Sequence, residues 1–285
     1  MNPNFDQLKT YESYLLLGNF SPRTSRSYVT TVRYFLQFCE KEFPLNPLSQ
    51  ELAREYLMQR YQSGLSWSAI NCDYSALRKY FKNIIDVEWS FKKIPRPRKD
   101  KVLPRILSQD EIIKIIESAV TYKQQIFFTF LYSTGMRLSE AIHIKIEDID
   151  AKRLQIRINL GNGHKDRFVQ VPECLIKILR EYYQRMRPQI YLFNGIKKGN
   201  PYSSRAVQWA MKRSKSIGKI TKKGSVHTFR HCYATHHLEN GTDLVYIQEQ
   251  LGHKNLKTTA KYIHLCVDRY RNIKHPIDQV QIRFR

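Results

Sequence analysis

Three short stretches in the second half of the chain concentrate side chains that can act on a phosphodiester. STGMRLSE places Arg137 two residues after a glycine, and HTFRH places His227 and Arg230 three residues apart, on one face of a helical turn. LGHKNLKTTAKYIH places His253 at the end of one expected helix and Tyr262 on the next. Each stretch alone has an ordinary structural explanation, such as a capping arginine or a tyrosine in the core. Their chemistry becomes specific only if the fold brings them together.

Together these side chains would suit one reaction, the attack of a phenol on a phosphate. Two guanidinium groups can hold the oxygens of one phosphodiester and stay cationic at any relevant pH. Imidazoles can donate hydrogen bonds or move protons, and nearby cations can stabilise a phenolate as it forms. The sequence has no carboxylate cluster for a two-metal site and no GxxxxGK[ST] loop, so we expect no metal and no ATP or other cofactor.

The charge of the chain points to a polyanionic partner. Among 285 residues, 48 Lys and Arg face 25 Asp and Glu, which gives a formal net charge of +23. The basic residues are interleaved with Tyr and Phe in foldable sequence, which favours nucleic acid, while a basic RNA-associated protein remains an alternative. The sequence has no apolar run long enough to predict a membrane span, and its N-terminus does not show the pattern of an export signal. Five scattered cysteines without a CxxC pair indicate reduced thiols and a cytoplasmic protein.

A break in the pattern at IPRPRKDKVLPR divides the chain. Three prolines and five basic residues within residues 94–105 are incompatible with a helix or a central strand. We therefore expect a helical domain at residues 1–93, a basic linker at 94–105, and a second domain with a C-terminal tail at 106–285.

The first domain is predicted to be a bundle of four helices. Asp6 is a possible cap of the first, and Ser21, Ser49 and Ser66 have the position and residue type of N-caps for the others. Basic side chains on these helices could meet a phosphate backbone, although solvated surface is the ordinary alternative. The candidates for DNA contact are Arg23, Arg26, Arg78 and Lys79.

The second domain is predicted to be mainly helical with one small antiparallel sheet. Ser108 opens a helix with a capping box, and Gly135 ends an apolar helix. RLQIRINL and RFVQVP alternate as strands around the turn GNGHKD. The helix from Ser203 to Gly218 is the candidate for entry into the major groove of DNA. Its proposed contact residues are Arg205, Lys212 and Arg213.

TGMRLSE, HTFRH, LGH and TTxxY, in this order, resemble the motifs of the tyrosine recombinase family, which contains phage integrases and Xer-like enzymes. The resemblance covers the whole second domain. The first domain resembles the helical, SAM-like core-binding module of the family, with SPRTSRSYVTTVRYF similar to its typical opening. This resemblance implies a site-specific recombinase that acts on double-stranded DNA at a specific recombination site, as a tetramer on two DNA sites.

The resemblance also implies a role for each motif residue. Tyr262 would attack a DNA phosphate and form a 3′-phosphotyrosyl bond, releasing a 5′-hydroxyl. Arg137 and Arg230 would hold the phosphate, His227 would assist proton transfer, and His253 would hydrogen-bond the phosphate. Glu140, three residues after Arg137, would orient that arginine rather than act as a catalyst. The covalent bond would conserve the energy of the cleaved phosphodiester, so strand exchange through a Holliday junction would need neither metal nor ATP.

One position departs from the family pattern. The hairpin turn usually resembles GKGxK, with its first lysine acting as general acid, whereas GNGHKD has Asn162 in that place. We expect Lys165, three residues later, to replace it, although Lys165 could instead contact only the DNA backbone. Two alternatives stay open: a topoisomerase of the same chemistry, and a DNA-binding protein with this fold and impaired catalysis. The sequence does not identify the target site or the biological task.

Overall fold

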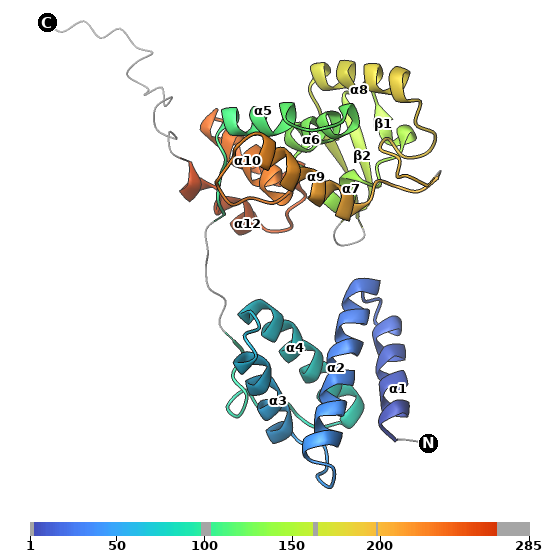
Figure 1. Ribbon diagram of the computed structural model, residues 1–285, viewed down its shortest axis with the longest axis vertical. Coiled ribbons are helices and arrows are strands. Elements are labelled where there is room, and N and C mark those ends of the chain that lie inside the picture. Colours follow the sequence, from blue (N-terminus) through green and yellow to red (C-terminus); the bar gives the residue numbers. More distant parts are fainter. Residues whose placement is uncertain (1–2, 98–103, 162–164, 198, 267–285) are drawn as a thin grey trace, which may run out of the picture. The chain divides into compact units, whose positions relative to one another are not determined.

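The chain folds into two compact units, Met1–Val102 and Leu103–Arg285. The computed structural model describes residues 3–97, 104–161, 165–197 and 199–266. Both units are built mainly from helices, and the second also contains a small sheet (Figure 1). None of the helices in the described part of the chain has the length and apolar character that a membrane span needs.

The first unit is a helical bundle, as predicted. The serines at positions 21, 49 and 66 accept hydrogen bonds from backbone N–H groups in the first turns of their helices, which satisfies donors that would otherwise be unpaired. The first helix begins earlier than Asp6, so the suggested cap there is wrong. The helices are α1 (Pro3–Leu17), α2 (Pro22–Glu42), α3 (Gln50–Gln62) and α4 (Trp67–Tyr80), followed by a π-helical turn, η1 (Phe81–Ile85).

Apolar residues at helical spacing form the core of this bundle. Val32, Phe35 and Leu36 on α2 pack among aromatic side chains of α1, α3 and α4. The segment after η1 belongs to the same core, since Trp89 and Ile94 are buried there. The first residues of the expected linker therefore pack on the bundle. The domain boundary at residue 93 and the linker at 94–105 stay predictions, since residues 98–103 lie outside the described residues.

The second unit combines a helical core with a three-stranded antiparallel sheet in the order β1-β2-β3. The predicted hairpin is present, and a short strand before it, absent from the prediction, completes the sheet. Ser108 forms the predicted capping box with Glu111. The helices are α5 (Gln109–Glu117), α6 (Tyr122–Thr134), α7 (Leu138–Ala141), α8 (Glu173–Met186), α9 (Ser204–Ile217), α10 (His227–Glu239), α11 (Leu244–Leu251) and α12 (Leu256–Ala260), with 3₁₀ turns η2 (Ile146–Asp148) and η3 (Ile263–Leu265). The strands are β1 (Ile149–Asp150), β2 (Gln155–Gly161) and β3 (Lys165–Gln170).

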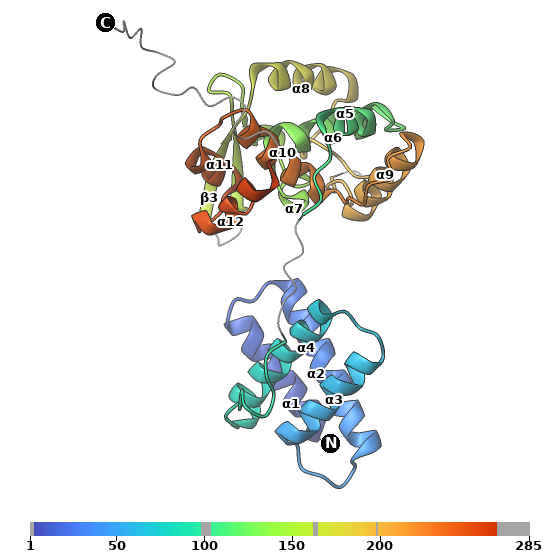
Figure 2. The same cartoon turned by 90° about the vertical axis from the view of Figure 1, so that its left-hand side faces the viewer.

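The central helix α10 positions much of the second unit. It packs against α6, and most of its side chains are buried. Figure 2 shows α11 beside β3, and α10 contacts both α11 and η3. Arg230 and His231 on α10 hydrogen-bond to Gly135, Leu251 and Tyr262 in the other motifs. The motifs are far apart in sequence, and this packing brings them together.

Candidate active site

The turn after α6 fixes the first motif. Gly135 ends α6 in the left-handed region, with φ of 60°, and its N–H donates to the carbonyl of Leu131. A Cβ added here would lie 2.5 Å from the ring of Tyr233 on α10. Only glycine combines this conformation with so close an approach. The turn presents Arg137 as the N-cap residue of α7, and its Gly135 carbonyl accepts a hydrogen bond from Arg230 on α10.

Glu140 holds two guanidinium groups. Its Oε1 accepts from Nη1 of Arg137 at 2.9 Å, and the backbone N–H of Arg137 donates to Oε2 at 2.9 Å. Arg167 on β3 donates to both carboxylate oxygens, at 2.9 and 2.8 Å. This arrangement agrees with the expected orienting role of Glu140, and it leaves most of the Arg137 guanidinium for another acceptor.

The charge state of Glu140 follows from these contacts. Burial alone would raise the pKa of its carboxyl, but the hydrogen bonds and charge of Arg167, joined by Arg137, lower it to about 2. Glu140 is therefore ionised near neutral pH. The three groups carry two positive charges against one negative, so the cluster keeps a net positive charge that suits a phosphate.

Arg230 is almost completely buried, with 2% of its surface exposed. Nη1 donates to the carbonyl of Gly135 at 2.8 Å, and Nη2 donates to the carbonyl of Leu251 at 2.5 Å and contacts Nε2 of His253 at 3.0 Å. Among the described residues these contacts use three of the five N–H donors that an arginine carries, which leaves two for a ligand. Burial, followed by the charge of Arg137, lowers its pKa to about 10, so it remains a cation at neutral pH.

His253 supports Arg230 from the loop after α11. Since Arg230 can only donate, Nε2 of His253 is the acceptor in their contact, and its Nδ1 donates to Oγ1 of Thr259 at 2.9 Å. Burial, followed by the charges of Arg230 and other arginines, lowers the pKa of His253 to about 4. The ring is thus neutral, and donating to a phosphate would require it to exchange a partner.

Gly252 allows the approach of α11 to the sheet. Its φ of 63° closes the helix, and a Cβ at this position would lie 2.8 Å from Cδ and Nε of Arg167. The glycine of the LGH motif therefore makes room for the arginine that binds Glu140.

Tyr262 is buried, with 5% of its surface exposed, between α12 and η3. The prediction that it lies on a helix is wrong, because α12 ends at Ala260. Its hydroxyl is 3.0 Å from Nδ1 of His231, and its ring lies parallel to that of His253 with 6.4 Å between centroids. Burial raises the pKa of Tyr262, and the positive charges of Arg230 and Arg137 oppose this rise.

His227 opens α10 and is exposed. Its ring meets that of His231 edge to face, with 4.6 Å between centroids. Desolvation of the imidazole by its neighbours, followed by the charges of Arg230 and Arg137, lowers the pKa of His227. The second unit thus brings together five of the six predicted catalytic residues. Lys165 begins β3, but its side chain and all of Asn162 lie outside the described residues.

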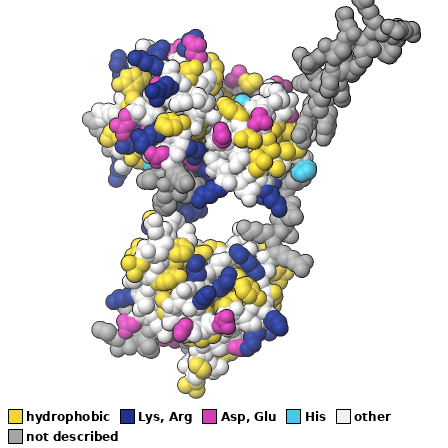
Figure 3. Space-filling view, turned by 180° about the vertical axis from the view of Figure 1, so that it is seen from behind, with side chains coloured by type: hydrophobic (Ala, Val, Ile, Leu, Met, Phe, Trp, Pro, Cys, Tyr) yellow, Lys and Arg dark blue, Asp and Glu magenta, His cyan; other side chains and the backbone are white. Residues whose placement is uncertain are grey.

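The seven predicted DNA-contact residues lie on three helices. Arg23 and Arg26 are exposed on α2 and line a groove of about 940 Å³ with residues of α4. Others contact aromatic rings: the Arg78 guanidinium lies 4.7 Å from the ring of Phe91, and the Lys79 ammonium lies 4.8 Å from that of Phe20. Figure 3 shows Lys and Arg side chains on the surfaces of both units. The remaining three, all exposed on α9, are Arg205, Lys212 and Arg213.

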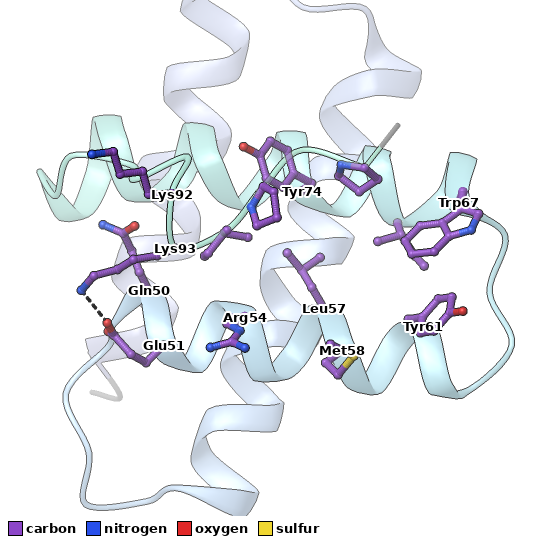
Figure 4. A pocket seen from close by; sticks show the side chains of 14 residues that line it. Gln50, Glu51, Arg54, Leu57, Met58, Tyr61, Trp67, Tyr74, Lys92 and Lys93 are labelled. Atoms are coloured by element: carbon purple, nitrogen blue, oxygen red, sulfur yellow. Dashed lines mark hydrogen bonds and ion pairs between the residues drawn. The ribbon is translucent and has the colours of Figure 1, made fainter. Parts of the chain in front are cut away.

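A separate cavity of about 770 Å³ lies in the first unit, between α3, α4 and the segment that follows η1 (Figure 4). Tyr61 and Trp67 stack at its rim with 4.5 Å between ring centroids. Its ion pair joins Lys93 to Glu51 at 2.8 Å. None of the predicted catalytic residues lines it. Within the described part of the chain, no group of three or more His, Cys, Asp or Glu side chains could hold a metal ion.

Sequence reasoning missed two residues of this site, Arg167 and His231. In the sequence Arg167 looks like any other polar residue of a strand. Only its contact with Glu140 in the structure distinguishes it from those residues. His231 directly follows Arg230 in HTFRH, and helical geometry places it next to His227 four residues earlier. That i, i+4 spacing was a usable signal.

Comparison with known proteins gives family matches over both units of the chain. Residues 105–269 match the Phage integrase family, and residues 8–91 match the Phage integrase, N-terminal SAM-like domain. The chain belongs to the phage integrase family. It is 30% identical over 273 residues to tyrosine recombinase XerA of Pyrococcus horikoshii, covering 94% of this chain and 92% of that protein. It is 33% identical over 262 residues to a putative integrase/recombinase, y4qK, of Sinorhizobium fredii, covering 91% and 84%.

Solved structures of this family share the fold. The XerA recombinase aligns with a TM-score of 0.53 at 25% identity, over 94% of this chain and 96% of that one. A lambda integrase tetramer bound to a Holliday junction aligns with a TM-score of 0.74 at 17% identity, over 96% and 80%. The family membership identifies the enzyme as a tyrosine recombinase, a site-specific recombinase that breaks and rejoins DNA strands.

Proposed function

We propose that Tyr262 is the nucleophile of this recombinase and that Arg137 and Arg230 hold the scissile phosphate. One observation carries the proposal: the buried Tyr262 lies in a cluster with His231 and His253, and His253 contacts Nη2 of Arg230 at 3.0 Å. A phenol is a poor nucleophile on its own, and cations beside the reacting phosphate stabilise the charge that develops there.

The proposed reaction follows from these positions. The Tyr262 oxygen attacks phosphorus in line with the departing 5′-oxygen, and a phosphotyrosyl bond replaces the DNA phosphodiester. Arg137 and Arg230 offer free N–H donors to the phosphate oxygens. His227 assists proton transfer, and His253, which holds the buried Arg230 in place, hydrogen-bonds the phosphate after it exchanges one of its present partners. A 5′-hydroxyl from a second duplex reverses the step and thereby exchanges strands.

The test uses a DNA duplex nicked near the cleavage point, so that cleavage releases a short fragment with a free 5′-hydroxyl, which diffuses away and cannot reverse the reaction. The wild-type chain should accumulate a covalent protein–DNA product that survives denaturation. Tyr262→Phe should form none while binding the same duplex with affinity unchanged within about twofold, because the ring and its packing remain. A covalent product in the variant would contradict the proposal.

Lys165 is proposed as the general acid that protonates the 5′-oxygen, in place of the lysine that the family pattern has where this chain has Asn162. We expect Lys165→Ala to slow cleavage by about 10²-fold or more, the usual contribution of general acid catalysis. A substrate with sulfur at the 5′-bridging position should restore the rate, because a thiolate leaves without protonation. Failure of this rescue would remove Lys165 from the role.

The substrate is proposed to be double-stranded DNA at a specific recombination site, gripped through the basic helices α2, α4 and α9. The lambda integrase structure on a Holliday junction is a tetramer, which supports a tetramer of this chain on two DNA sites. Electrophoresis of the protein with paired sites should show a complex of four protomers. The location that sequence predicts, the cytoplasm, stays a prediction.

Nothing favours the alternative of a DNA-binding protein with impaired catalysis. His227, Arg230, His253 and Tyr262 are joined by contacts with one another and with His231, and the charge of Arg137 acts on Arg230 and Tyr262. The nicked duplex separates the two functions, since a binding protein would retain the DNA and yield no covalent product.

A further inference from the structure

His231 is in direct contact with the hydroxyl of Tyr262, and its imidazole is a group that can take a proton. Its Nδ1 lies 3.0 Å from the hydroxyl of Tyr262, a normal hydrogen-bond distance. The two rings are 5.6 Å apart and tilted by 48°. His231 is a half-buried residue of α10, a helix whose side chains are mostly buried, so the packing of α10 places it beside Tyr262.

The other histidines of the site are less suited to this contact. Both ring nitrogens of His253 are engaged, one with Arg230 and the other with Thr259. His227 touches the ring of His231 and is exposed at the start of the helix. Of the imidazoles in the described residues, only that of His231 is hydrogen-bonded to the Tyr262 hydroxyl.

We propose that His231 is a catalytic residue of this recombinase, the base that takes the phenolic proton of Tyr262 during cleavage and returns it during rejoining. The proposal rests on the proposed role of Tyr262. As the oxygen–phosphorus bond forms, the O–H bond of Tyr262 breaks and its proton moves to Nδ1 of His231. The 5′-oxygen leaves with the electrons of the broken phosphorus–oxygen bond and takes a proton from the general acid. Rejoining runs the same transfers backwards.

The charges around His231 make this transfer depend on the substrate. Burial, followed by His227 and Arg230, lowers its pKa to about 4, so the ring is neutral and can accept the phenol's hydrogen bond. A phosphate held by the arginines offsets the positive charge that lowers this pKa. The imidazole should therefore become more basic when the phosphate that Tyr262 attacks is in place.

The test compares cleavage of the nicked duplex by the wild type, His231→Ala and His231→Asn. The Asn side chain places an amide oxygen near the position of Nδ1, so it can accept the phenol's hydrogen bond but cannot act as a base. Both variants should cleave about 10²-fold or more slowly than the wild type. Cleavage near the wild-type rate by His231→Asn would mean that His231 only orients the phenol. Cleavage near the wild-type rate by His231→Ala would mean that His231 has no role in the reaction. Either result overturns the proposal.

The substrate with 5′-bridging sulfur supplies a second readout. It bypasses the acid but still requires removal of the phenolic proton, so it should rescue Lys165→Ala and leave both His231 variants slow. Rescue of the His231 variants would overturn the proposal. Thermal melting and duplex binding confirm that each variant folds, and if Ala does not fold, Asn decides alone. Absence of product from the wild type would instead contradict the role of Tyr262.

Discussion

At the scale of single residues, the carboxylate of Glu140 is the centre on which both Arg137 and Arg167 depend. Its side chain is 8% exposed, and it accepts hydrogen bonds from both guanidinium groups at 2.8 to 2.9 Å. Removing one partner of a buried ion pair leaves the others with uncompensated charge, which is more costly than losing a surface pair. Glu140 therefore links the stability of the unit to the position of Arg137.

We expect Glu140→Gln to lower the free energy of unfolding at pH 7 by about 3 kcal/mol. Since Arg137 loses its charged partner, cleavage of the nicked duplex should also slow by about 10-fold or more. Chemical denaturation and the covalent-product assay measure the two effects. Lys145→Ala, which removes an exposed pair with Glu147, is the matched control and should change neither.

The ion pairs of Glu140 also give the stability of the chain a defined pH dependence. The carboxyl of Glu140 has a pKa of about 2 in the folded chain against an ordinary value of 4.5. A lowered pKa contributes stability above the unfolded value and loses it as the pH falls through the folded value. The stability gap between wild type and Glu140→Gln should thus narrow as the pH drops from 4.5 towards 2. A gap that stays constant over this range would mean that the ionised carboxylate is not its source.

At the scale of elements, two helix ends carry the geometry of the site. Gly135 and Gly252 each have positive φ, and each lies where a side chain from another element leaves no space for a Cβ. Gly241 also has positive φ, of 80°, but among the described residues no atom beyond its own chain neighbours lies within 4 Å of its Cβ position. These glycines separate the cost of backbone conformation from the cost of crowding.

We expect Gly241→Ala to destabilise the chain by about 1 kcal/mol, the usual cost of a left-handed conformation with a side chain. Gly252→Ala should cost more, because its methyl group would displace Arg167 from Glu140. It should also slow cleavage, whereas Gly241→Ala should not. Equal effects of the two substitutions on stability and cleavage would show that the contact of Gly252 with Arg167 is unimportant.

Elements were predictable where the signal is local. Ser21, Ser49, Ser66 and Ser108 cap helices as expected, because a capping side chain needs only neighbours within its own turn. The hairpin followed from its alternation, but β1 did not, since a two-residue strand has no pattern of its own.

The site was predictable only as far as its motifs. Tyr262 was misplaced on a helix because α12 stops two residues earlier, and Arg167 was missed because its role depends on packing of β3 against α7. Such contacts are set by tertiary structure, which residue spacing within one segment does not encode.

At the scale of the whole molecule, the net charge of +23 is the property that acts on DNA at a distance. Binding that neutralises phosphates releases counterions, so affinity should fall with salt at a log slope of about 0.9 per phosphate neutralised. Both units carry candidate basic residues, and the full chain should therefore show a steep slope. A slope near zero would contradict DNA binding through these helices.

We expect replacement of Arg23 and Arg26 by Ala to reduce this slope by about 1.8, since each exposed guanidinium is proposed to neutralise one phosphate. Lys177→Ala is the control: this lysine on α8 pairs with Glu173 at 3.0 Å and should leave the slope unchanged. Fluorescence anisotropy over a salt series measures all three proteins. An unchanged slope in the double variant would remove α2 from the proposed DNA surface.

The anchoring of Arg230 to the carbonyls of Gly135 and Leu251 has a consequence for how this sequence can diverge. Every amino acid supplies the same backbone oxygen, so mutational drift in most surrounding side chains leaves these two acceptors untouched. The anchor is lost only when the path of the main chain changes. Related enzymes can therefore change the surface residues that select a target while the backbone contacts that hold Arg230 stay the same.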